Sequence, residues 1–74
     1  MDANQTLYLE AIIAREGHRL VARTGEIPSL HRLDIYVRTA ADYDTRLETE
    51  PGFERMRQTL IQTYLDERSS ATQR

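Results

Sequence analysis

Apolar residues recur along this chain at spacings of three and four, the pattern of helices that bury one face. Alternation of apolar and polar residues, typical of half-buried strands, never extends over more than a few positions. The single β-like triplet, Ile35-Tyr36-Val37, has helical flanks. Three glycines and two prolines interrupt the pattern. The chain therefore predicts an all-α fold, a small bundle of four to five short helices.

Glycine and proline positions set the expected helix ends. The first helix, Ala3–Glu16, has Asp2 or Asn4 as its N-cap and stops at Gly17. The other helices are expected at residues 18–24, 29–39 and 41–49 and from residue 53 onward.

The last expected helix carries the most regular apolar stripe. Its members are Phe53, Met56, Leu60, Ile61, Tyr64 and Leu65. We expect them to pack onto the preceding helices as core, because so short a chain has no other means of covering them. The stripe is wider than one partner helix needs, so a homodimer formed through this helix stays open as an alternative.

Length and composition limit the class of protein. The 74 residues suit one domain, which we expect over residues 1–68, with a disordered tail at 69–74 that lacks an apolar anchor. No cysteine is present, which excludes disulfides and thiolate metal sites and favours a reducing, cytoplasmic location. No segment approaches the roughly 20 apolar residues of a membrane span, and the N-terminal residues lack the order of a signal peptide.

Residues suited to catalysis or metal binding form no recognisable constellation. His18 and His31 are far apart, and neither belongs to a spacing that places two ligands on one helical turn. The acids between Asp42 and Glu50 do not follow the ligand order of a calcium loop. No phosphate-binding loop or nucleophile motif occurs. We therefore expect a protein that is not an enzyme and that carries no metal or cofactor.

Charge is distributed unevenly, although the formal net charge is only −2. All ten basic residues are arginines, and five of them lie with both histidines between Arg15 and Arg38, against three acids. Five acids follow between Asp42 and Glu54, against Arg46 alone. The chain can therefore present two electrostatically different faces.

The segment around Gly25 has the pattern of a helix-turn-helix. This motif needs a small residue in the first helix, a tight turn, and apolar positions that fix the second helix while its other face stays free. Ala22 is the candidate small residue and Gly25 the turn. Leu30, Leu33 and Val37 are expected to fix the second helix. The same two helices could equally form an ordinary corner of a helical bundle.

A series of short motifs follows the turn. In order these are Pro28-Ser29, Leu33, Tyr36-Val37 and Asp42-Tyr43. This order of a Pro-Ser pair, an apolar residue, an aromatic-aliphatic pair and an acidic-aromatic pair resembles the helix-turn-helix of phage small terminase subunits and related mobile-element proteins. The resemblance implies a DNA-binding helix from Ser29 to Thr39 in a small phage-type regulator of transcription or of phage DNA handling.

The resemblance also implies which side chains meet DNA. Those implied to face the major groove are His31, Arg32, Ile35 and Arg38. Those implied to lie near the phosphates are Arg15, Arg19 and Arg23. Against strong DNA binding stand the pI of about 5.6 and Asp34, which falls in the middle of the proposed reading face.

Ile35 supports a second interpretation. An aliphatic residue opposite the core stripe of its helix needs a contact, either a thymine methyl or a partner protein. In size and character the chain is also similar to small phage proteins that bind host machinery, RNA polymerase above all, in the host cytoplasm. Such a regulator or inhibitor would use the same surface without binding DNA.

Overall fold

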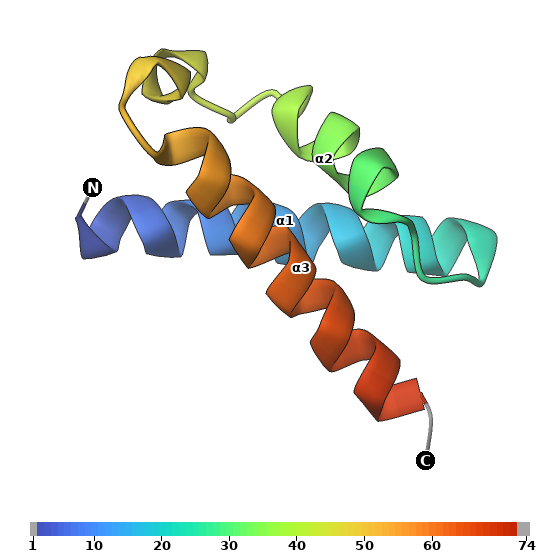
Figure 1. The fold of residues 1–74 in the computed structure, drawn as a ribbon. Coiled ribbons are helices and arrows are strands. Elements are labelled where there is room, and N and C mark those ends of the chain that lie inside the picture. The colour runs from blue at the N-terminus through green and yellow to red at the C-terminus, as the bar shows by residue number, and fades with distance from the viewer. Residues whose placement is uncertain (1, 73–74) are drawn as a thin grey trace.

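The structure is a computed structural model that describes residues 2–72, and three α-helices dominate it (Figure 1). The elements in chain order are α1 (Ala3–Thr24), α2 (Leu30–Arg38), the 3-10 helix η1 (Thr45–Thr49) and α3 (Phe53–Thr72). No strand occurs among the described residues, so the all-α prediction is confirmed. There are fewer helices than expected, because two of them join into α1 and another is reduced to η1.

α1 runs without a break through Gly17, where two separate helices were expected. Gly17 is buried where α3 crosses α1, and a Cβ atom on it would come within 2.5 Å of Tyr64 Cε2. Glycine costs about 1 kcal/mol relative to alanine inside a helix, but only a residue without a side chain lets the Tyr64 ring lie here. The expected break was therefore wrong, because this glycine marks a close helix crossing.

The other expected ends of α1 and α2 are confirmed. The Asp2 carboxylate accepts the N–H of Gln5, while the Gln5 side chain accepts the N–H of Asp2. Gly25 ends α1 in the left-handed region, at a φ of 74°. Ser29 caps α2 by accepting the N–H of Arg32. Local chemistry thus sets the turn between the two helices.

Residues 41–49 form a turn and η1 in place of the expected fourth α-helix. The hydroxyl of Tyr8 on α1 accepts the N–H of Asp44 at 2.7 Å and donates to the carbonyl of Asp42. Asp44 then caps η1 by accepting the N–H of Arg46. Backbone groups committed to Tyr8 cannot join an α-helical ladder, so the helix is shortened to a single 3-10 segment.

α3 carries the expected apolar stripe and extends further than expected. The buried members are Phe53, Ile61 and Leu65, and the half-buried members that pack against them are Met56, Leu60 and Tyr64. The interpretation of the stripe as core is confirmed, whereas the homodimer stays a prediction. α3 continues through Thr72, so residues 69–72 of the expected disordered tail are helical, and Gln73 and Arg74 lie outside the described residues.

α2 packs onto the core largely as expected. Leu33 and Val37 are fully buried and Leu30 is half-buried. Ala22, expected at the crossing of the first two helices of the motif, is exposed. The small residue at a helix crossing is instead Gly17, and the helix that approaches it is α3. The helix-turn-helix packing around Ala22 was therefore predicted wrongly, because its position faces solvent.

A buried ion pair crosses the core between α2 and α3. Arg57 exposes 2% of its surface and Asp34 6%, and Arg57 Nε donates to Asp34 Oδ1 at 2.7 Å. A terminal nitrogen of Arg57 also donates to the Tyr43 hydroxyl and to Glu48 of η1. Burial alone would lower the pKa of Arg57, but the hydrogen bond and charge of Asp34 outweigh it and raise that pKa. The guanidinium therefore stays protonated inside the core.

Replacement of Gly17 by alanine is expected to lower the free energy of unfolding by about 1–3 kcal/mol, because the new methyl group overlaps the Tyr64 ring. In a Tyr64→Ala background the same substitution is expected to raise it by up to about 1 kcal/mol, through the higher helix propensity of alanine. Urea denaturation followed by circular dichroism measures both effects. Equal effects of Gly17→Ala in the two backgrounds would contradict the close contact with Tyr64.

Arg57→Met is expected to lower the free energy of unfolding by about 3–5 kcal/mol, because it leaves the Asp34 carboxylate buried without its partner. This loss is comparable to the whole stability of a small domain. The double substitution Arg57→Met with Asp34→Leu is expected to recover most of it, since no charge then remains buried there. Circular dichroism without denaturant shows whether the single variant is folded, and urea denaturation gives the stability of each variant that is. A double variant no more stable than the single one would contradict the ion pair.

Candidate nucleic-acid interface

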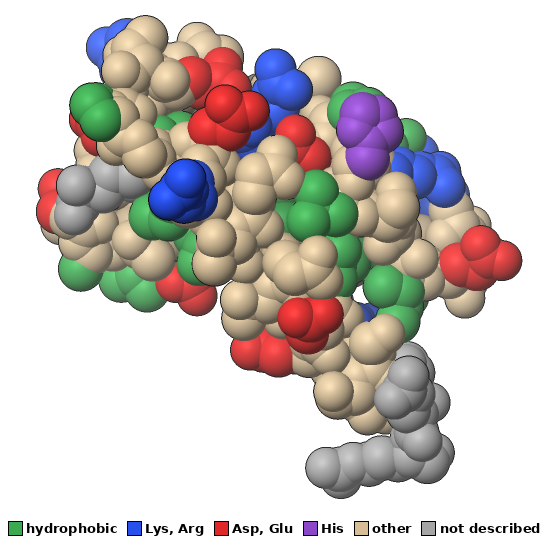
Figure 2. All heavy atoms as spheres, viewed as in Figure 1, with side chains coloured by type: hydrophobic (Ala, Val, Ile, Leu, Met, Phe, Trp, Pro, Cys, Tyr) green, Lys and Arg blue, Asp and Glu red, His purple; other side chains and the backbone are tan. Residues whose placement is uncertain are grey.

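α2 turns one face to the core and the other to solvent. Its exposed face and C-cap comprise His31, Arg32, Ile35, Arg38 and Thr39. Ile35 exposes 44% of its surface, and the Arg32 side chain makes no hydrogen bond or ion pair with the described residues. Figure 2 shows a histidine with basic side chains beside it over α2, whereas acidic side chains gather towards η1. The four residues predicted to face the major groove are therefore all exposed.

Asp34 does not belong to this face, contrary to expectation. Its side chain is 8% exposed and points into the core, where it accepts from Arg57. Asp34 is the one acid of α2, so the exposed face of this helix carries no carboxylate. The expected conflict between Asp34 and a phosphate backbone was wrong, because the side chain is turned inwards by its partner on α3.

Arg38 is exposed but already engaged. Its Nε lies 3.4 Å from a Glu48 oxygen, and a terminal nitrogen lies 3.8 Å from Asp34. Half of the Arg38 side chain is exposed, at 49%, so solvent weakens these pairs. Arg38 nevertheless belongs to the outer edge of the network around Arg57, and its positive charge is largely balanced within the protein.

Three arginines of α1 line a cleft against α2. Arg15, Arg19 and Arg23 follow one another at intervals of four residues and therefore lie on one side of the helix. The cleft has a volume of about 490 Å³, and its other lining residues are Glu16, Tyr36, Thr39, Ala40, Ala41 and Asp42. The structure thus brings together the three arginines that the resemblance places near phosphates.

These arginines differ in what they bind. Both terminal nitrogens of Arg15 donate to Asp42, at 2.8 and 2.7 Å, and its Nε donates to Glu16 at 3.0 Å. Arg19 also donates to Glu16, at 3.2 Å, and its side chain is 63% exposed. Arg23 makes no hydrogen bond or ion pair with the described residues. The positive charge available to a ligand therefore increases along α1 from Arg15 to Arg23.

The pair of Arg15 and Asp42 is fully ionised at neutral pH. The hydrogen bonds from Arg15 lower the pKa of Asp42, and those same bonds raise the pKa of Arg15. Both side chains are substantially exposed, at 38% and 51%, so the pair adds little to stability. The consequence of the pair is that the Asp42 carboxylate engages both terminal nitrogens of an arginine that lines the cleft.

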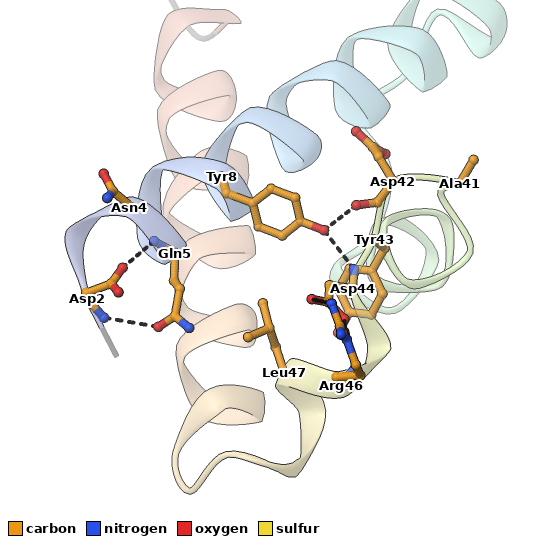
Figure 3. Close-up of a pocket in the computed structure, with 10 residues that line it drawn as sticks. All are labelled: Asp2, Asn4, Gln5, Tyr8, Ala41, Asp42, Tyr43, Asp44, Arg46 and Leu47. Atoms are coloured by element: carbon orange, nitrogen blue, oxygen red, sulfur yellow. Dashed lines mark hydrogen bonds and ion pairs between the residues drawn. The ribbon is translucent and has the colours of Figure 1, made fainter.

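A second cleft, of about 570 Å³, lies between the start of α1 and residues 41–47 (Figure 3). Tyr8 points across it to the backbone of Asp42 and Asp44. The hydrogen bonds from Arg46 to Asp44 lower the pKa of this carboxyl. None of the predicted site residues lines this second cleft. Its lining includes Tyr8, whose hydroxyl holds the turn after α2.

Sequence reasoning did not place Tyr36, Thr39 or Asp42 in the site. Tyr36 belongs to the side of α2 that faces α1, and Thr39 is its C-cap. Asp42 is 27 positions from Arg15 in the chain, and no periodic signal connects them. The spacing of the α1 arginines was the one local signal for the cleft, because residues four apart share a side of a helix.

Comparison of the chain with protein-family models, with curated proteins and with solved structures finds no match. None of the helices in the described part of the chain is long and apolar enough to cross a membrane. Within residues 2–72 no three histidine, aspartate or glutamate side chains are grouped so that they could hold a metal ion. The assignment of the candidate interface therefore depends on the geometry and charge of its residues.

Arg15→Ala is expected to raise the pKa of Asp42 towards its ordinary value of 3.8, because the guanidinium that favours the carboxylate is removed. Because the pKa of Asp42 is lower in the folded protein than in the unfolded chain, the pair stabilises the protein at pH values above the pKa of the unfolded state. This contribution is lost as the pH falls through the folded pKa. Carbon-13 NMR titration of the aspartate carboxyls gives the value.

Arg46→Ala is the matched control for this titration. It removes an arginine that pairs with Asp44 and leaves Arg15 in place, so the pKa of Asp42 should not change. An Asp42 pKa that is the same in the Arg15→Ala variant as in the unmodified protein would exclude the bidentate pair.

Proposed function

We propose that this protein is a small, non-enzymatic regulator that binds duplex DNA through the outward face of α2 and the neighbouring arginines of α1. The observation that carries the proposal is the presence of two exposed cations, Arg23 and Arg32, on the two helices that flank one turn, neither of which has a side-chain partner among residues 2–72. Phosphate backbones attract such cations. The exposed face of α2 carries no acid that would oppose this attraction.

The dimensions of α2 suit a reading helix. An α-helix with its side chains is about 10–12 Å across, so α2, which has nine residues, can lie in the major groove, which is about 12 Å wide. In helix-turn-helix proteins the first turns of the second helix contact base edges. Arg32 would then donate to a guanine, and Ile35 would meet a thymine methyl. The resemblance to phage small terminase subunits supports the same helix-turn-helix arrangement.

The charge distribution limits the strength and the direction of binding. The net charge is −2, so the protein as a whole repels DNA, and we expect it to approach DNA with the corner formed by α1 and α2. Two or three phosphate contacts imply an affinity that falls about 10- to 40-fold between 50 and 200 mM salt. We therefore expect modest, strongly salt-dependent binding by each copy of the chain.

Arg32→Ala and Arg23→Ala are each expected to weaken duplex binding on the order of tenfold at about 50 mM salt, because each removes one cation from the contact. Each variant should also reduce the slope of log affinity against log salt by about one. Fluorescence anisotropy with a random-sequence and a source-genome duplex measures the affinities, and circular dichroism verifies that the variants are folded.

Arg55→Ala is the matched control. Arg55 is exposed on the first turn of α3, away from the α1–α2 turn (Figure 1), and has no ion pair with the described residues. It removes the same charge from a different surface, so duplex binding should change less than twofold. Equal losses in the Arg55 and Arg32 variants, or no duplex binding by the folded protein at about 50 mM salt, would refute the proposal.

A second candidate function is favoured by the exposure of Ile35, at 44%. An aliphatic side chain in the middle of a cationic face also suits a protein partner. On this alternative the chain is a phage-encoded inhibitor or regulator of host machinery, most readily RNA polymerase. Direct binding of the purified chain to RNA polymerase, abolished by Ile35→Asp and indifferent to DNA, would favour this function over the first.

A further inference from the structure

Asp42 occupies an unusual position in the cleft between α1 and α2. Its two carboxylate oxygens accept from both terminal nitrogens of Arg15, at 2.7 and 2.8 Å. A guanidinium presents this same pair of donors to two oxygens of a phosphate group. The carboxylate therefore lies where one edge of a bound phosphate would lie against Arg15.

The charge of the cleft changes with the position of this carboxylate. Arg15, Arg19 and Arg23 bring three positive charges, and Glu16 and Asp42 bring two negative ones, which leaves a formal charge of +1. Without Asp42 the formal charge is +2. Glu16 stays in either case, because it is buried, at 7% exposure, and accepts from both Arg15 and Arg19. Asp42, whose side chain is 51% exposed, is the acid of the cleft that can be displaced.

The backbone that carries Asp42 is held independently of its carboxylate. The Tyr8 hydroxyl bonds the main chain of Asp42 and Asp44 (Figure 3). The next side chain, Tyr43, is buried in the core and accepts from Arg57. The carboxylate can therefore leave Arg15 by side-chain rotation while the turn stays in place.

We propose that this cleft is a phosphate-binding site and that Asp42 is its internal competitor, which a phosphate group displaces from Arg15. The inference rests on the proposed function, in which the phosphate belongs to the DNA backbone, and it adds a residue that limits the affinity. Arg23, unpaired in the same cleft, supplies the initial attraction. Arg15 becomes a second phosphate contact once Asp42 has been displaced.

The test compares Asp42→Asn with Asp44→Asn as matched control. Both substitutions remove one negative charge from the same turn, but only Asp42 pairs with Arg15, since Asp44 pairs with Arg46. The first probe is inorganic pyrophosphate, titrated against the ¹⁵N-labelled protein and followed at the Arg15 Nε and at the amides of residues 39–42. Thermal melting verifies that each variant is folded.

Asp42→Asn is expected to bind pyrophosphate about tenfold more tightly than the unmodified protein, and Asp44→Asn is expected to stay within about twofold of it. The gain should disappear when Arg15→Ala is added to Asp42→Asn, because the phosphate group then has no Arg15 to contact. Arg15→Ala alone should weaken pyrophosphate binding, because the second phosphate contact is lost while the Asp42 carboxylate remains in the cleft. If Asp42→Asn binds no more tightly than Asp44→Asn, the internal competitor is excluded.

Duplex DNA as the second probe separates this inference from the proposed function. If Asp42→Asn gains affinity for both pyrophosphate and duplex, with a salt slope steeper by about one, both are supported. A gain for pyrophosphate with no duplex binding by any variant would establish the phosphate site and refute DNA as its source. Duplex binding that depends on Arg32 but responds equally to Asp42→Asn and Asp44→Asn would overturn the inference alone.

Discussion

The arrangement of this protein depends on one buried charge. Arg57 lies in the middle of the apolar stripe of α3 and donates to Asp34 on α2, to the Tyr43 hydroxyl and to Glu48 of η1. A guanidinium is tolerated in a core only when its charge is balanced and its donors are satisfied. The positions of α2, of the turn after it and of η1 are therefore all coupled to the position of α3.

This network also decides the character of the surface. Because Asp34 is turned inwards, the outward face of α2 carries no acid, and because Arg38 pairs with Glu48, part of its positive charge is compensated. Arg23 and Arg32, on the two helices beside the first turn, are among the arginines whose side chains have no partner within residues 2–72. Internal ion pairs therefore decide which arginines are available to a ligand. The number of arginines in the chain does not show this.

Much of the fold follows from short-range patterns. The all-α class, the caps at Asp2 and Ser29, the turn at Gly25 and the buried stripe of α3 depend on residues within a few positions of one another. The outward position of Ile35 follows in the same way, because the core residues of α2 fix the opposite face. Local chemistry therefore determined the helical class, these caps and the exposed face of the candidate site.

Tertiary structure decided the rest, because the deciding contacts join distant parts of the chain. The local sequence around Gly17 predicts a helix end. Only the contact with Tyr64 of α3 shows that Gly17 lies where α1 and α3 cross. Arg57 stands four positions from Phe53 and from Ile61, a spacing that hints at burial, but a charge is stable there only with a partner on another helix. The pairing of Asp42 with Arg15 has no sequence signal, because it exists only after the turn has been fixed on α1. The sequence by itself determined the all-α class, the caps of the first two helices and which charges the protein carries, and packing determined the number of helices and which of those charges remain free.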